Sequence, residues 1–176
     1  GAATPAPQTI VDLGCGTGVA GAAWALECLP PPAIDGVDVN PWATGEAQWT
    51  YSRLGLTGRA KKGDLARVAL GGRETAVVAA FTVNELETPD RDALRVRLLE
   101  GGGPVLIVEP LARGVSPWWD EWEGAFRDDG GRAERLQTVA GHARAWAADL
   151  GDMAAINILA ALLDGAGDEE RSFRLL

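Results

Sequence analysis

Cysteine and histidine are scarce in this sequence, which contains two cysteines and one histidine among 176 residues. Cys15 and Cys28 cannot form a metal site by themselves, so we expect no bound metal and two reduced thiols rather than a disulfide. The single histidine, His142, lies in a region of weak patterning, and we assign it no catalytic role.

Long hydrophobic runs and an excess of basic residues are also missing. No run is long enough to span a bilayer, and residues 1–7 lack the features of a signal peptide, so we expect a cytoplasmic protein with no membrane partner. Sixteen basic residues against twenty-five acidic ones give a net charge of -9. The basic clusters, Arg59/Lys61/Lys62 and Arg132/Arg135, are short, which argues against a strong nucleic-acid patch.

Apolar content is sufficient for a folded core. With 47% hydrophobic residues, the chain suits a single domain over residues 1–176. Strand-like and helix-like runs alternate, with strands expected at 9–13, 33–38, 58–62, 76–83 and 104–108, and helices at 19–29, 42–54, 89–99 and 116–126. We expect Thr88 to cap the third helix, and the charged run 58–62 to be an edge strand.

Repeated strand–helix units imply right-handed crossovers. The sequence therefore predicts an α/β fold, a doubly wound, mostly parallel sheet with helices on both faces. Beyond Gly131 the pattern weakens, and there we expect a strand at 134–139, a helix at 142–164 and, at 171–176, either a last short strand or a frayed tail.

A glycine-rich loop follows the first expected strand, in the segment Asp12-Leu13-Gly14-Cys15-Gly16-Thr17-Gly18. Glycine allows positive φ and removes the Cβ that would block a close approach of the backbone to a ligand. Because the loop leads into a helix, free N–H groups and the helix dipole would face a polar ligand there.

Further polar residues follow other strands. Asp38 ends the second strand, Asp64 and Leu65 follow the third, Asn84 and Glu85 follow the fourth, and Glu109 ends the fifth. Ligands of doubly wound sheets bind outside the carboxyl ends of the strands, where the strand order reverses. An acid about twenty residues after such a loop suits the two hydroxyls of a ribose.

Three of these motifs, Val11 to Gly18, Gly36-Val37-Asp38-Val39-Asn40 and Gly63-Asp64-Leu65, resemble those of the class I S-adenosylmethionine-dependent methyltransferases. The resemblance covers residues 9–110, the cofactor-binding core, and leaves 111–176 as a C-terminal part. It implies a Rossmann-like sheet of seven strands with an antiparallel last strand. It also implies S-adenosylmethionine as cofactor.

The same resemblance implies roles for single residues. Gly14, Gly16 and Gly18 would wrap the methionine part of the cofactor, and Asp12 would lie near its ammonium. Asp38 would hold the ribose, and Asp64 and Leu65 would border the adenine. The rest of the cofactor-binding set is Cys15, Val39 and Thr82.

A narrower resemblance involves Ala80 to Leu86 and Gly103 to Pro110, which look like segments of the ribosomal-small-subunit-associated methyltransferase-like family. It would imply the ribosomal small subunit as a partner and an rRNA or ribosome-linked methyl acceptor, although a small-molecule acceptor is also open. This chain lacks the cysteines that many members of that family carry.

Several alternatives stay open. Gly16-x-Gly18-x-x-Gly21 also fits a dinucleotide fingerprint, which would make the protein an NAD-dependent oxidoreductase, and a non-catalytic assembly factor that binds the cofactor is a third reading. Asn84 and Glu85 either bind the acceptor and act as a base, or cap a turn and face solvent. Trp42 either stacks on adenine or is buried. The tryptophans Trp118, Trp119 and Trp122 form core or a partner surface rather than a substrate cage.

Overall fold

The computed structural model describes residues 6–110, 117–131, 134–136 and 173–175. The chain forms two compact units, Gly1–Ile107 and Val108–Leu176. The predicted helix at 142–164 and His142, to which we assigned no catalytic role, lie outside the described residues.

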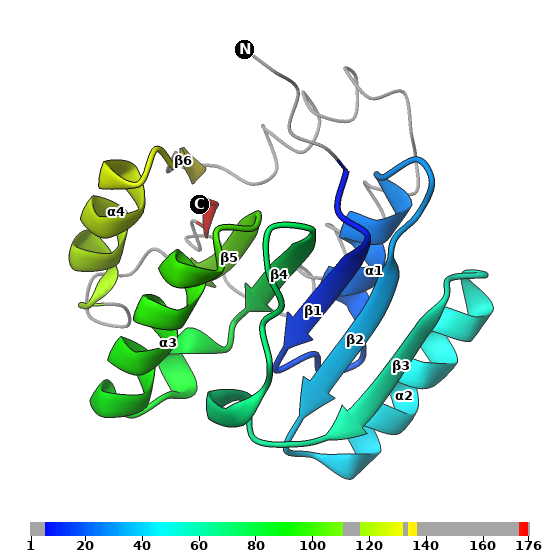
Figure 1. The fold of residues 1–176 in the computed structure, drawn as a ribbon. Helices are drawn as coiled ribbons and strands as arrows, with labels where there is room; N and C mark the ends of the chain where they lie inside the picture. Colours follow the sequence, from blue (N-terminus) through cyan, green and yellow to red (C-terminus); the bar gives the residue numbers. More distant parts are fainter. Residues whose placement is uncertain (1–5, 111–116, 132–133, 137–172, 176) are drawn as a thin grey trace. The chain divides into compact units, whose positions relative to one another are not determined.

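The first unit is built on parallel strands, as predicted. They are β1 (Thr9–Leu13), β2 (Ala33–Asp38), β3 (Gly58–Lys62), β4 (Thr75–Ala80) and the start of β5 (Val105–Pro110). Their order is β3-β2-β1-β4-β5 (Figure 1). The chain thus adds strands on one side of β1 as far as β3 and then crosses to the other side with β4, so the strand order reverses between β1 and β4. At such a point an open α/β sheet binds its ligands.

Helices cover both faces of this sheet, as expected for a doubly wound fold. They are α1 (Val19–Leu26), α2 (Pro41–Arg53) and α3 (Thr88–Gly101). Figure 1 shows α1 and α2 behind strands β1 to β3, and α3 in front of β4. The side chain of Asn40 caps α2 by accepting a hydrogen bond from the Trp42 N–H at 3.0 Å, and Gly102, with φ 63°, ends α3 in the left-handed conformation.

Several predicted boundaries are wrong, and two of them have a local reason. The first helix ends at Leu26 rather than at residue 29, because the N–H groups of Glu27 and Cys28 bond to carbonyls three residues back and tighten the last turn. The fourth strand ends at Ala80 rather than at residue 83. At Phe81 the backbone takes φ 57°, which no regular strand accommodates, and residues Val83–Glu85 then form the short 3₁₀ helix η2.

The third helix begins at the expected cap residue, one residue earlier than predicted. Thr88 is its first residue, and Glu87 occupies the capping position without a side-chain hydrogen bond. The Thr88 hydroxyl instead accepts a hydrogen bond from the Arg91 guanidinium at 3.1 Å. The N-cap prediction was therefore wrong, although the proline in the first turn was correctly placed.

The predicted edge strand is confirmed at β3, which ends the strand order. Two of its backbone groups are bonded to Gln48 of α2, whose amide donates to the Gly58 carbonyl at 3.0 Å and accepts from the Ala60 N–H at 3.3 Å. Such contacts occupy part of the edge that another chain could otherwise pair with. On the other face of the strand, Arg59 forms an ion pair with Asp35 at 2.7 Å.

The second unit contains the end of β5, the helix α4 (Trp119–Asp128) and two short strands, β6 (Glu134–Leu136) and β7 (Phe173–Leu175). β7 pairs antiparallel with both β5 and β6, so the antiparallel strand that the resemblance implied is present. The predicted strands at 134–139 and 171–176 are confirmed in their described parts.

A cluster of aromatic side chains fills the core of this second unit. Trp118, Trp119 and Trp122 are all buried, and the rings of Trp118 and Trp122 meet edge to face with centroids 4.9 Å apart. The interpretation of these tryptophans as core is therefore confirmed. Glu109 is also fully buried in this unit, on β5.

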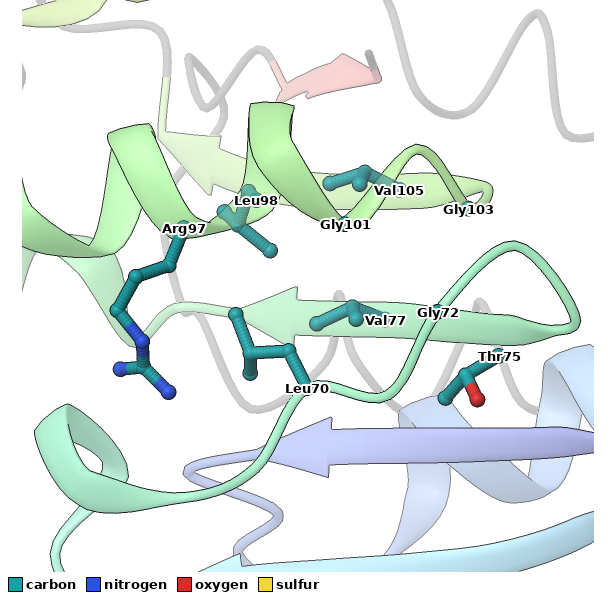
Figure 2. A pocket seen from close by; sticks show the side chains of 9 residues that line it. All are labelled: Leu70, Gly72, Thr75, Val77, Arg97, Leu98, Gly101, Gly103 and Val105. Carbon is teal, nitrogen blue, oxygen red and sulfur yellow. The ribbon is translucent and has the colours of Figure 1, made fainter.

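Within its described residues, the first unit has a small cavity between α3 and the beginnings of β4 and β5 (Figure 2). Its lining includes Thr75 and Val105, the first residues of their strands, so it lies away from the glycine loop. None of the helices in the described ranges is long and apolar enough to cross a bilayer.

Candidate functional site

The glycine loop has the backbone conformation that its sequence predicts. Gly14, Gly16 and Gly18 have φ values of 60°, 51° and 81°, in the left-handed region that favours glycine. A Cβ on Gly16 would meet no atom within 4 Å, whereas one on Gly14 or Gly18 would collide with side chains. The open space beside Gly16 is therefore the side from which a ligand can approach the backbone.

Asp38, at the end of β2, fixes the loop from one side. Its Oδ2 accepts a hydrogen bond from the Gly16 N–H at 2.9 Å, and its Oδ1 accepts one from the Asn40 N–H at 2.8 Å. Each carboxylate oxygen retains acceptor capacity, because an ionised carboxylate has about four acceptor positions. The carboxylate is half-buried, so it remains open to hydroxyl donors from a ligand.

Asp12, the last residue but one of β1, fixes the loop from beneath. Its Oδ2 accepts a hydrogen bond from the Gly21 N–H in the first turn of α1 at 3.0 Å. A Cβ on Gly21 would lie 2.6 Å from that oxygen, so the absence of a side chain there makes the hydrogen bond possible. Burial raises the pKa of Asp12 to about 7, against a smaller lowering by the Gly21 hydrogen bond.

Tyr51 of α2 lies under the loop together with Cys15. Its ring and hydroxyl occupy space that glycines leave free, since Cβ atoms built on Gly18, Gly36 and Gly58 would lie 2.7, 2.8 and 2.7 Å from Tyr51 atoms. The Tyr51 hydroxyl has no hydrogen-bond partner of normal geometry, yet it faces the Asp12 carboxyl closely enough to lower that carboxyl's pKa. Burial raises the pKa of the Cys15 thiol to about 12, which makes it a poor nucleophile.

Thr82 links the ends of β4 and β1. Its hydroxyl lies 3.0 Å from the carbonyl oxygens of both Leu13 and Ala80, to one of which it donates. A Cβ on Gly14 would lie 2.3 Å from this hydroxyl, so the first glycine of the loop is needed for the contact. Thr82 is thus buried against the loop backbone, where its described contacts support the loop.

The predicted adenine-bordering residues follow β3. Asp64 accepts a hydrogen bond from the Ala66 N–H at 2.9 Å and so caps the short 3₁₀ helix η1 (Leu65–Arg67). The Arg97 guanidinium of α3 donates to the carbonyls of Ala66 and Val68 and ties this segment to the helix. Arg97 also lines the neighbouring cavity, and Figure 2 shows its side chain extending from α3 beside Leu70.

Large apolar side chains are exposed near the carboxyl ends of β2 and β4. Val39 and Trp42 are 64% and 66% exposed, and Phe81 is 37% exposed. The interpretation of Trp42 as a buried tryptophan is therefore wrong. Asn84 is half-buried and Glu85 is exposed, and both lie in η2 directly after β4.

The residues at this edge combine polar and apolar surface. Asp38 presents a half-buried carboxylate, exposed Val39 and half-buried Leu65 present apolar side chains, and the backbone at Gly16 has open space beside it. Within the first unit, β1, β2 and β4 end at this same edge, so the residues of the loop, Asp38, Thr82 and Asn84 are brought together by the sheet register.

Sequence reasoning missed two supporting residues. Tyr51 was not among the predicted site residues, and its contacts with three glycines from separate segments were not foreseen. Arg97 was not considered at all. The sequence signal for Tyr51 was its position four residues after Ala47, which puts both on one face of α2. This spacing predicts that Tyr51 is buried, but it does not predict which residues surround it.

No protein-family model matches the sequence, and a search of curated proteins finds no relative. Solved structures are similar in fold. An S-adenosylmethionine-dependent methyltransferase from Geobacter sulfurreducens, in complex with S-adenosyl-L-homocysteine, has a TM-score of 0.57 and 18% identity over 97% of this chain and 83% of its own. One from Thiobacillus denitrificans, with the same ligand, has a TM-score of 0.58 and 18% identity, with 97% and 85% covered.

Other similar structures differ in reaction or in length. The [4+2]-cyclase SpnF has a TM-score of 0.61 and 20% identity, with 97% of this chain and 73% of its own covered. Another similar structure comes from work on the conversion of a disulfide bond into a thioacetal group during echinomycin biosynthesis. It has a TM-score of 0.51 and 21% identity, and the match covers 64% of this chain but only 49% of that protein. These likenesses establish a Rossmann-like methyltransferase fold.

Proposed function

We propose that this chain binds S-adenosylmethionine at the glycine loop and transfers its methyl group. The observation that supports this most is the pair of carboxylates that hold the loop, Asp12 through Gly21 and Asp38 through Gly16. The S-adenosyl-L-homocysteine bound in two structures of similar fold agrees with this choice of ligand.

The two carboxylates favour a cationic ligand over a dinucleotide. A dinucleotide loop offers its backbone N–H groups to an anionic pyrophosphate. Here the Gly16 N–H is already donated to Asp38, and the buried Asp12 lies beneath the same loop. Like charges repel, so this arrangement disfavours pyrophosphate and suits a ligand that carries sulfonium and ammonium charges.

The proposed roles follow from position. Asp38 would hold the ribose, Val39, Asp64 and Leu65 would border the adenine, and Gly14, Cys15, Gly16 and Gly18 would follow the methionine part, with Thr82 supporting the loop. The cofactor supplies a reactive methyl group on its sulfonium, so the protein contributes mainly orientation and exclusion of water. Asn84 is proposed to hydrogen-bond the methyl acceptor, and Glu85 to take up its proton.

The identity of the acceptor is a separate proposal. The narrower resemblance at residues 80–86 and 103–110 implies a ribosome-linked acceptor or an assembly role, and a small-molecule acceptor stays open beside it. The net charge of -9 does not favour an acceptor made of nucleic acid. Because SpnF, a cyclase, shares the fold, binding of the cofactor and transfer of its methyl group must be measured separately.

Calorimetry with S-adenosyl-L-homocysteine and with NAD tests the binding site. We expect the first ligand to bind and NAD not to bind. Asp38→Ala should weaken S-adenosyl-L-homocysteine binding by about tenfold to a hundredfold, because it removes both the ribose acceptor and an anchor of the loop. Asp35→Ala is the matched control, since Asp35 lies on the same strand but pairs with Arg59. Binding of NAD alone would refute the proposal.

A further inference from the structure

Asp12 is a buried acid without a cation beside it. Its side chain is 1% exposed, and within the described part of the chain its recorded interactions are with the Gly21 N–H, the Tyr51 hydroxyl and the like charge of Asp38. A buried carboxylate normally pairs with a positive charge, because burial penalises an uncompensated charge. The protein itself provides no such charge at this carboxyl among these partners.

Among the described elements packed around Asp12, none places a cation beside its carboxyl. The helix α1 and the strand β4 contain no ionisable side chain. The glycine loop contributes Cys15, β2 contributes Asp38, and α2 contributes Tyr51. Cys15 is a thiol with a raised pKa, Asp38 carries the same charge as Asp12, and burial raises the pKa of Tyr51, so all three leave the carboxyl without a counter-charge.

The Tyr51 hydroxyl, which lies beside Asp12, is a buried polar group without a hydrogen bond. It is fully buried and lacks a hydrogen-bond partner of normal geometry. A hydroxyl that faces a carboxyl stabilises its ionised form by donating to it. Tyr51 thus stands ready to donate to Asp12 once that carboxyl is charged, and its ring holds Gly18 in place meanwhile.

We infer that Asp12, supported by Tyr51, supplies the negative charge that recognises the sulfonium of the cofactor from beneath the glycine loop. The site would thereby distinguish the charged cofactor from its neutral thioether product, S-adenosyl-L-homocysteine. This inference rests on the proposed function. The two ligands share the same zwitterionic amino-acid part, so the sulfonium is the charge by which they differ.

A cation bound above the loop favours ionisation of Asp12, so binding near neutral pH must release a proton. Burial places the pKa of this carboxyl at about 7, which leaves about half of the molecules protonated at that pH. A lowering by about one unit on binding would release about 0.4 proton. The neutral product should release less.

Isothermal titration calorimetry in two buffers of different ionisation enthalpy measures this release. At pH 7 we expect S-adenosylmethionine to release at least about 0.2 proton more than S-adenosyl-L-homocysteine does. Equal release for the two ligands would overturn the inference while leaving the proposed function intact. Failure of both ligands to bind would instead refute the proposed function itself.

Two variants test whether the released proton comes from Asp12. Asp12→Asn should abolish the difference between the ligands, and the control Asp35→Asn should keep it. If Asp12→Asn does not fold, Tyr51→Phe tests the inference instead. Loss of the hydroxyl raises the pKa of Asp12, so the pH at which ligand binding releases most protons should be higher in this variant. A maximum at the same pH in Tyr51→Phe would contradict the role given to Tyr51.

Discussion

Replacing the buried acid Asp12 should stabilise the protein at neutral pH. The folded-state pKa of this carboxyl is about 7, against an ordinary value of 3.8. Between these values the folded protein holds a proton that the unfolded chain does not, so the free energy of unfolding falls as pH rises through this window and is level above it. Asp12→Asn removes this titration, and the amide oxygen can still accept the Gly21 N–H.

The magnitude follows from the two pKa values. At about 1.4 kcal/mol per unit, full ionisation of Asp12 costs the fold roughly 4 kcal/mol above pH 7. From pH 5 to pH 8 the advantage of the Asn variant over the wild type should grow by roughly 3 kcal/mol. Other titrating groups cancel in this comparison, because both proteins contain them.

Urea unfolding followed by circular dichroism at pH 5 and pH 8 measures this difference, with Asp35→Asn as the control for a generic loss of negative charge. An Asn variant whose free energy of unfolding differs from that of the wild type by the same amount at both pH values would refute the reasoning. A stabilised variant with weakened cofactor binding would show that the acid is kept for function at a cost in stability.

Two further perturbations separate support of the loop from contact with the ligand. Gly14→Ala and Gly16→Ala both place alanine at positive φ, at roughly 1–2 kcal/mol each, but only the first collides with Thr82. Gly14→Ala should therefore lose more stability in thermal unfolding, and Gly16→Ala should chiefly lose affinity for S-adenosyl-L-homocysteine; the reverse order would contradict the geometry. Arg97→Met removes two hydrogen bonds to the backbone after Leu65. It should weaken the same binding by about tenfold, with partial recovery in Arg97→Lys; unchanged affinity in Arg97→Met would show that this segment lies away from the ligand.

The sheet of the first unit was largely predictable from the sequence. The bounds of β1, β2 and β3 agree with the predicted strands, because turn residues or prolines flank each apolar or alternating run. The end of β4 was not predictable, since the apolar run continues through Phe81 and Val83 while the backbone turns at Phe81. Hydrophobic periodicity cannot report such a turn.

The candidate site was predictable in its residues but not in their partners. The spacing of Asp12, the glycines and Asp38 indicates a ligand loop, yet which N–H group each carboxylate accepts depends on how α1 and β2 pack against it. Thr82, predicted among the ligand-binding residues, lies with its hydroxyl against the backbone of β1. The contacts of Tyr51 join Gly18, Gly36 and Gly58, which belong to three separate segments, and only the fold brings them together.

The central claim is that S-adenosylmethionine binds at the carboxyl edge of β1 and β2 through the glycine loop and Asp38. A crystal structure of the protein with S-adenosyl-L-homocysteine tests it most directly. The account predicts both ribose hydroxyls within hydrogen-bond distance of the Asp38 carboxylate and the amino-acid part beside Gly14 and Gly16. A ligand found elsewhere on the protein, or a ribose without contact to Asp38, would contradict it.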